Sequence, residues 1–437
     1  MIVLLALSIF LFFNKNRLIS VLIFFFFLTN GFQLVPEEWF GFGSIIAKSI
    51  DYAILYVIFF FVFFILSENT IYYDIGFVKW IYLFLSFLII LFFINRYIYD
   101  VPWNEIFRTG RFYFLLLGFV VFLHLKKHEV NDLIISLFKI TLFLSILFIL
   151  QVALNKQILN GFYGGTMISI GELSIPRCYN YPFLLSFFLF FSFFSNPFSG
   201  IYKLASQFIT VITLILPMHR SLIGTSLMIV VLGILMKNRI SIKSISLIIW
   251  FAIALSPLTY FLHDRFSENT SQDLQSIYNG EFIQQESDFG ESTMLFRFAH
   301  FYERLAYISN EPLYTIFGLG LMTEDSDITY NTLDFHIGLS EENSSDVIQL
   351  ETADFSWSIL ILRFGFLGTL IYLLMYFALM RISLMYSTEN QIGFLALLST
   401  FLISFASWSL VNMVFIMVPL LDLCLRYGEN QQRTLNL

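Results

Sequence analysis

One long apolar run, Leu204–Met236, contains a single arginine close to its middle, within LILPMHRSLIGTS. An α-helix rises about 1.5 Å per residue, so the run as one helix would be about 50 Å long, whereas the hydrocarbon core of a bilayer is about 30 Å thick. The run therefore predicts two membrane passes that meet at Pro217–Ser221. Because Lys203 and Lys237 flank the run, both of its ends are expected on one side of the membrane and Arg220 on the other.

The composition extends this reading to the whole chain. Hydrophobic residues make up 58% of the 437 residues and charged residues only 13%, while a soluble domain has about 25% charged residues. The mean hydropathy is +0.79. We expect an all-α polytopic membrane protein with about 12–13 transmembrane helices. The apolar segments are 2–13, 18–34, 45–66, 77–94, 111–125, 132–154, 179–195, 200–216, 219–236, 242–262, 355–381, 391–407 and 410–424.

The spans divide the chain into three parts: an N-terminal helix bundle (1–262), a polar loop (263–354) and C-terminal helices with a short tail (355–437). Lysine and arginine in short loops mark the cytoplasmic side. The turn at Arg220, the loop that holds Arg177 and the segment 263–354 are therefore predicted to face outward. The basic loops that set this orientation are 14–17, 126–127 and 237–243.

Arginine dominates the basic residues of the predicted outward loops, and its planar fork suits phosphate and carboxylate groups. Arg220 and its neighbour His219 precede a helix, whose free N–H groups favour an anion. Arg177 also precedes a helix, between Pro176 and Pro182. Both arginines are candidates for binding a phosphate; the competing interpretation is that each only anchors its helix at the lipid headgroups.

The outer segment contains a helical pattern in TMLFRFAHFYERLAYIS. At 100° per residue, Arg297, His300 and Arg304 fall on one stripe beside apolar positions. This predicts an amphipathic helix in the membrane interface with its basic edge at phosphate level. The alternative is a scaffold helix that packs on the bundle.

Two carboxylates, Glu351 and Asp354, come directly before the span 355–381 and share a face if the helix already runs there. A carboxylate at this depth is costly unless it is paired or functional, although Asp354 could also serve only as a helix cap. Arg363 lies deeper in the same span, and we expect it to be paired or functional. We expect the same of Asp51 and Lys139.

Five motifs follow one another between about residues 105 and 380. They are PRCYNYPFLLSFF, MHRSLIGTSL, R-x-x-x-x-x-x-R in the outer loop, FGLGL, and a polar residue followed eleven positions later by G-x-x-G. Their order resembles the Wzy-type O-antigen polymerases and O-antigen ligases, bacterial membrane glycosyltransferases grouped with the GT-C folds. The resemblance implies a GT-C-like bundle in the bacterial inner membrane, with one large periplasmic loop that contains the amphipathic helix, and an active site that faces the periplasm.

The resemblance implies polymerisation of O-antigen, capsule or exopolysaccharide from repeat units carried on undecaprenyl diphosphate. Donor and acceptor would both be lipid-linked glycans. The bilayer and a chain-length regulator are further expected partners, and no cofactor, metal or nucleic acid is expected. The resemblance implies that Arg177, Arg220 and Arg297 hold the diphosphate. The residues of the predicted outward side add His219, His300 and Arg304 as further candidates for the diphosphate, and Asp354 and Glu351 as candidates that act on the acceptor hydroxyl.

One departure bears on the type of transferase. Ligases of this superfamily typically have a histidine, often followed by asparagine, at the position that Asp354 holds here. The difference favours a polymerase and leaves the identity of the base open. The alternatives are an O-antigen-ligase-type transferase and a transporter of lipid-linked oligosaccharides. Transporters more often show internal repeats and basic residues through the full depth of the bundle, whereas polar groups here gather in the outer half, except for Arg363 and Lys139.

Overall fold

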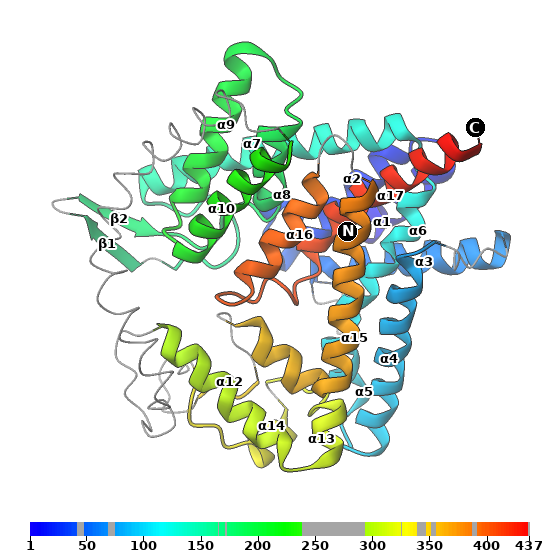
Figure 1. Cartoon of the computed structure of the whole chain (residues 1–437), viewed down its shortest axis with the longest axis vertical. Helices are drawn as coiled ribbons and strands as arrows, with labels where there is room; N and C mark the ends of the chain where they lie inside the picture. The colour runs from blue at the N-terminus through cyan, green and yellow to red at the C-terminus, as the bar shows by residue number, and fades with distance from the viewer. Residues whose placement is uncertain are drawn as a thin grey trace.

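The computed structural model describes residues 1–41, 48–68, 75–164, 166–170, 173–237, 293–324, 326–338, 347–350, 355–386 and 391–435. Of the described residues, 74% are helical. Two long helices, α4 (Val78–Tyr97) and α15 (Ser356–Tyr386), pack side by side along the long axis, and α7 (Lys127–Leu154) crosses near one end of them (Figure 1). At the opposite end lie α12 (Thr293–Ser309), α13 (Pro312–Phe317) and α14 (Asp327–Thr332).

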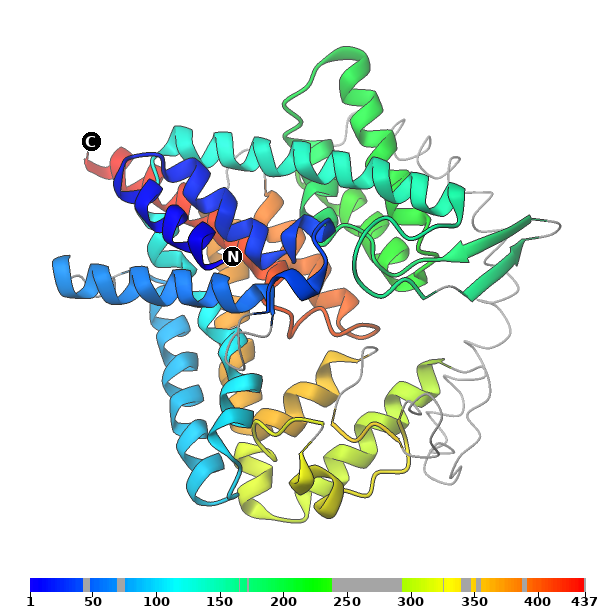
Figure 2. The ribbon, with the colours of Figure 1, turned by 180° about the vertical axis from the view of Figure 1, so that it is seen from behind.

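The other described elements complete the bundle. On the reverse face, α1, α2 and α3 lie between α7 and the end of the molecule that holds α12, α13 and α14 (Figure 2). The elements are α1 (Ile2–Phe13), α2 (Arg17–Leu28), η1 (Gly31–Gln33), η2 (Glu37–Trp39), α3 (Ser49–Glu68), α5 (Trp103–Gly110), η3 (Arg111–Leu117), α6 (Gly118–Leu123), β1 (Thr166–Ile170), β2 (Leu173–Arg177), α8 (Leu185–Phe194), α9 (Gly200–Ile215), α10 (Arg220–Lys237), α16 (Ile392–Ile403) and α17 (Val414–Leu435).

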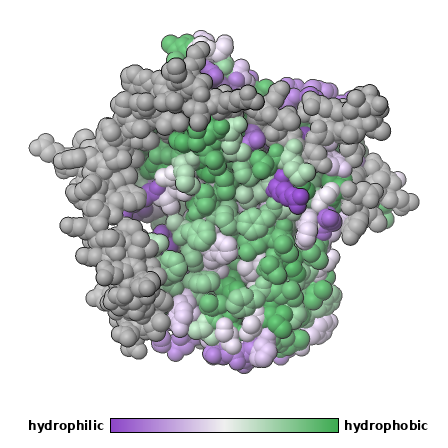
Figure 3. Space-filling view, viewed as in Figure 1, coloured by the Kyte–Doolittle hydropathy of each residue, from purple (hydrophilic) through white to green (hydrophobic). Residues whose placement is uncertain are grey.

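Five described helical stretches are long and apolar enough to cross a bilayer, and six shorter apolar helices accompany them. Large apolar side chains on these helices also face outward: Phe366, Leu370, Leu374 and Phe377 of α15 form an exposed stripe. Figure 3 shows apolar residues over the middle of one face, with hydrophilic residues toward its upper and lower edges. An apolar belt of this kind suits contact with lipid, so the chain is a multi-pass membrane protein. The five stretches are Ser49–Ser67, Val78–Tyr97, Trp103–Leu123, Lys127–Leu154 and Ser356–Met385.

The break predicted in the run Leu204–Met236 is confirmed. Helix α9 ends at Ile215 and α10 begins at Arg220. Pro217 lacks an N–H group and disfavours helix continuation, and Met218 adopts a left-handed backbone with φ of 53°. The expected span 242–262 lies outside the described residues.

A two-stranded antiparallel hairpin, β1–β2, was not predicted. Its register pairs Thr166 with Arg177 and Ile168 with Ile175. The strands are short and rich in β-branched residues, a composition that favours extended backbone. The apolar pattern that revealed the membrane helices carries little information about so short an element. The hairpin places Arg177 at the end of a strand.

Buried tyrosines connect the apolar helices. The Tyr376 hydroxyl donates to the Leu397 carbonyl at 2.7 Å, and the Tyr372 hydroxyl donates to the Leu410 carbonyl. Between α2 and α3, the Ser20 and Tyr56 hydroxyls are hydrogen-bonded at 2.7 Å. Each bond satisfies a polar group in an apolar core, where an unsatisfied group would be costly. These contacts fix α15 against α16 and the segment that follows it.

Helix α15 bends sharply at Gly365, whose φ and ψ are 60° and −166° (Figure 1). The FGLGL turn after α13 fills the bend: the Leu319 N–H donates to the Leu362 carbonyl at 2.7 Å. A Cβ on Gly365 would come within 2.5 Å of the Gly318 nitrogen. The two glycines therefore permit a close approach of two backbones. The first part of α15, which carries Arg363, is held at an angle to the rest.

Candidate functional site

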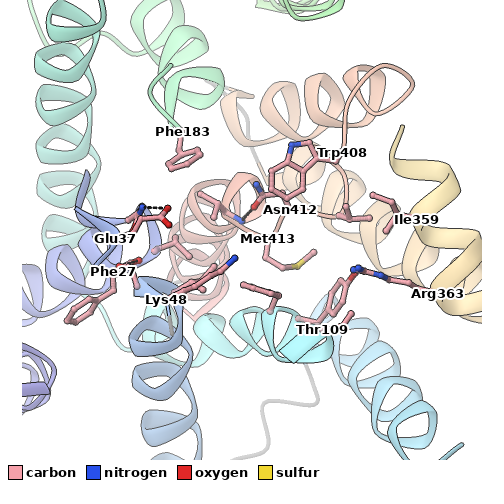
Figure 4. A pocket seen from close by; sticks show the side chains of 18 residues that line it. Phe27, Glu37, Lys48, Thr109, Phe183, Ile359, Arg363, Trp408, Asn412 and Met413 are labelled. Atoms are coloured by element: carbon pink, nitrogen blue, oxygen red, sulfur yellow. Dashed lines mark hydrogen bonds between the residues drawn. The ribbon is translucent and has the colours of Figure 1, made fainter. Parts of the chain in front are cut away.

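A cavity of about 540 Å³ lies where several helix ends converge (Figure 4). This volume is in the range of small-ligand sites, roughly 300–1,000 Å³. Its lining comes from the end of α2, the start of α3, the α5–η3 junction, the first part of α15 and the segment 408–414. In the predicted topology, each of these stretches lies at an outward end of its span. The structure thus gathers sequence-distant ends of one predicted side around a single space.

Three charged side chains line the cavity. Glu37 and Arg363 approach from opposite sides, and Lys48 extends between them (Figure 4). Asn30 and Asn412 add neutral polar groups. The cavity therefore has an acidic wall and a basic wall, and it can interact with a hydroxyl at one end and an anion at the other.

Most of the remaining lining is apolar and aromatic. The Phe183 ring and the Trp408 indole lie on the side of Asn412, and Trp408 is 47% exposed. Phe27, Phe112 and Ile359 are further members of the lining. Aromatic side chains offer flat apolar surface together with room for a few polar contacts. Such a lining suits an amphiphilic ligand that combines sugar or phosphate with lipid.

Asp51, which is ion-paired with Arg111, fixes the backbone of Lys48. The buried Asp51 accepts from the Lys48 backbone N–H at 3.1 Å and pairs with Arg111 at 2.9 Å. Ser49 donates its hydroxyl to the Phe27 carbonyl at 2.7 Å. These contacts hold the start of α3 against α2 and η3, and the α3 N-terminus also favours the negative charge of Asp51. The prediction that Asp51 is paired or functional is confirmed as a pair.

Asn30 projects from a left-handed turn, and Glu37 follows it as the first residue of η2. Residues 30–33 all have positive φ, between 53° and 66°, and only one of them is glycine. The buried Gln33 holds the turn: its amide donates to the carbonyls of Asn180 and Tyr181, and its side-chain oxygen accepts from the Phe183 N–H at 3.0 Å. The turn is thereby tied to the wall of the cavity that Phe183 forms.

The predicted diphosphate ligands do not line this cavity as far as the structure describes it. The Arg177 guanidinium stacks over the Tyr179 ring at 4.8 Å. Arg220 is half-buried at the start of α10, and the neighbouring His219 is hydrogen-bonded to the Ser221 hydroxyl at 2.9 Å. Arg297 is half-buried on α12. The predicted site and the described cavity therefore involve different residues.

The helix expected around Arg297 is found as α12, and two members of its basic edge, His300 and Arg304, are buried in the protein. Arg304 has no exposed surface and donates to the Glu303 carboxylate and to the carbonyls of Ile337 and Gln349, at 2.8, 2.6 and 3.2 Å. Its guanidinium also stacks on Phe335 at 4.4 Å. Burial lowers the pKa of Arg304 to about 10, so it remains charged at neutral pH. The prediction that Arg304 lies at the level of the lipid phosphates was wrong, because the residue is buried. Its guanidinium is occupied by protein groups and holds the backbone at Ile337 and Gln349 against α12.

His300 is also buried, with its Nδ1 hydrogen-bonded to the Ser358 hydroxyl at 3.0 Å. Burial, and secondarily the charge of Arg304, lowers its pKa to about 2. A histidine in an unfolded chain has a pKa of about 6.5, so the unfolded chain binds the proton more readily. Stability from His300 is therefore present above about pH 6.5 and is lost as pH falls below it. A neutral, enclosed ring packs α12 on α15.

The two predicted catalytic carboxylates, Glu351 and Asp354, lie outside the described residues. The segment just before them is held by Glu324, whose carboxylate accepts from the N–H groups of Gln349 and Leu350 at 2.5 and 2.8 Å. Within the described ranges, no group of three or more His, Cys, Asp or Glu side chains could hold a metal ion.

Sequence reasoning did not identify Glu37, Lys48 or Asn412 as site residues. Lys48 had been counted within a span, but α3 begins one residue later. A signal was present: PEEWFGFG places a proline, two carboxylates and a tryptophan in a predicted outward loop. Lys139, the other basic residue expected inside a span, is exposed on α7.

Fold and cavity together define a multi-pass membrane protein with an amphiphilic cavity at converging helix ends. No protein-family model matches the sequence, and a search of curated proteins finds no significant match.

Proposed function

We propose that this protein is a membrane glycosyltransferase that joins undecaprenyl-diphosphate-linked repeat units into a polysaccharide on the periplasmic side of the inner membrane. The observation that carries the proposal is the cavity that combines Arg363, Lys48 and Glu37 with aromatic walls. A lipid-linked sugar diphosphate has matching parts: an anion, hydroxyl-bearing rings and a lipid chain. The resemblance to O-antigen polymerases adds a GT-C-like bundle and one large periplasmic loop to the proposal.

The reaction requires stabilisation of a departing diphosphate. The anomeric carbon–oxygen bond breaks, and negative charge gathers on the diphosphate. Arg363 and Lys48 supply cations on the same cavity, and one preorganised donor of this kind can contribute about 10²–10³ in rate. Arg177, Arg220 and Arg297 remain proposed ligands for the lipid diphosphate outside the described cavity.

The test is to incubate the purified protein in lipid vesicles with undecaprenyl-diphosphate-linked repeat units. The proposal predicts a ladder of glycans that differ by one repeat unit. Transfer of a finished glycan to another acceptor, without a ladder, would favour a ligase. Movement of intact lipid-linked units across the bilayer, without new glycosidic bonds, would favour a transporter.

A further inference from the structure

Glu37 and Asn30 form a polar pair on the cavity wall opposite Arg363 (Figure 4). We propose that Glu37 is the general base that takes the proton from the acceptor sugar's hydroxyl, and that Asn30 orients its carboxylate. The assignment rests on the proposed glycosyl transfer. It places the acceptor sugar beside Glu37 and identifies this carboxylate as the base.

The Asn30 side chain is hydrogen-bonded to the Glu37 carboxylate and so orients it. The Asn30 side-chain N–H donates to Glu37 Oε1 at 2.9 Å. Glu37 begins the short helix η2 directly after Pro36, whose fixed φ favours this start. The Asn30 amide holds Glu37 Oε1. The other carboxylate oxygen, Oε2, would accept the proton of the acceptor hydroxyl. A base held in this way is oriented before the substrate arrives.

The turn that carries Asn30 has a strained backbone. Asn30, Phe32 and Gln33 are left-handed non-glycine residues, and each costs about 1–2 kcal/mol. Strained backbone persists where the surroundings over-determine it, and such places cluster at functional sites. Here the buried Gln33 supplies the constraint through its bonds to Asn180, Tyr181 and Phe183. The Phe183 ring lines the same cavity, so the network that sustains the strain also shapes the site.

The cavity separates a negative side chain from a positive one. In a displacement with inversion, the nucleophile and the leaving group lie on opposite sides of the anomeric carbon. Glu37 and Arg363 lie on opposite sides of the cavity, with Lys48 between them (Figure 4). A sugar placed between them would have its acceptor near the carboxylate and its diphosphate near the guanidinium.

The step balances without a further reactant. The acceptor oxygen forms a bond to the anomeric carbon while the hydroxyl proton passes to Glu37. The bond from that carbon to the phosphate oxygen breaks, and its electron pair leaves with the lipid diphosphate near Arg363 and Lys48. Glu37 then releases the proton to water at the mouth of the cavity, where its side chain is exposed.

The test compares Glu37→Gln with Glu38→Gln in the full-length protein in vesicles. Glu38 is the next residue, is also exposed and does not belong to the described lining. We expect Glu37→Gln to lower the rate of ladder formation by about 10²–10⁴, while binding of undecaprenyl diphosphate stays within about twofold of wild type. Glu38→Gln should keep the wild-type rate. Asn30→Ala, the positioning variant, should lower kcat more than it raises KM.

The outcomes separate this inference from the proposed function. A wild-type protein that forms no ladder contradicts both. A wild-type ladder with Glu37→Gln within fivefold of the wild-type rate overturns the role of Glu37 alone, and loss of turnover in Asp354→Asn in the same series would return the base to Asp354. Loss of diphosphate binding together with turnover in Glu37→Gln, or a lowered thermal stability that Glu37→Asp shares, would show a structural role and also overturn the inference.

Discussion

Replacing Arg304 with methionine should release the backbone around Ile337 and Gln349 from α12. The guanidinium donates to the Glu303 carboxylate and to the carbonyls of Ile337 and Gln349. Removal of one partner of a buried ion pair costs about 3–5 kcal/mol. The Glu303 side chain is 20% exposed, so water can compensate part of its lost contact, and we expect a loss of about 3 kcal/mol.

The loss should be local, so hydrogen exchange is the suitable assay. The N–H groups of Phe335 and Leu350 donate to the side chains of Gln349 and Glu324, respectively. If Arg304 clamps this region, these amides should exchange about 100-fold faster in Arg304→Met, because 3 kcal/mol changes an opening equilibrium by roughly that factor.

Two further variants sharpen the result. Arg304→Lys keeps the charge but loses the planar fork, so it should give an intermediate effect. Arg381→Met removes an exposed arginine of α15 and should leave the exchange unchanged. Exchange within threefold of wild type in Arg304→Met would refute the reasoning that this buried arginine holds the backbone around Ile337 and Gln349.

Three other predictions concern pH, the bend in α15 and the predicted turn. Lowering the pH from 7.5 to 5 should remove about 2 kcal/mol of stability through His300; thermal unfolding of His300→Gln should depend less on pH, and an equal dependence in both proteins would contradict the assignment. Gly365→Ala should lower both thermal stability and glycan synthesis, because the new Cβ would meet the FGLGL backbone and the residue has a positive φ. The control Gly41→Ala should be neutral, because its Cβ would meet only one atom, at 3.7 Å. Wild-type behaviour of Gly365→Ala would show that the bend adjusts freely. Arg220→Ala should give short or single-unit glycans at normal protein level, and an unchanged chain-length distribution would remove its proposed role.

The membrane helices could be predicted from sequence because lipid imposes a simple rule: about 20 apolar residues must form a helix that satisfies its own backbone. That rule located the break before Arg220 and the start of α15. It could not reveal the hairpin that ends at Arg177, since short strands lack an apolar period of sufficient length. It also could not show that Gly365 interrupts a helix, because this bend depends on a distant turn that packs against it.

The site was harder to predict because it forms from helix ends that are far apart in sequence. Arg363 was recognised as costly inside a span, and it does line the cavity. Glu37 was overlooked because a charged residue in an outward loop is ordinary in isolation, and Lys48 was overlooked because it was counted within a membrane span. Arg304 shows the opposite error: its place on a basic stripe favoured ligand binding, yet nearby carbonyls occupy its fork. Helical periodicity locates a face, but only the packed structure tells whether that face meets ligand or protein.

The most direct test of the central claim is the rate of ladder formation by Arg363→Ala in vesicles that contain undecaprenyl-diphosphate-linked repeat units, with Arg381→Ala as the exposed control on the same helix. If Arg363 stabilises the departing diphosphate, its loss should slow polymerisation by about 10²–10³, Arg363→Lys should restore only part of the rate, and Arg381→Ala should match wild type. A ladder that Arg363→Ala, correctly folded, forms at the wild-type rate would contradict the account.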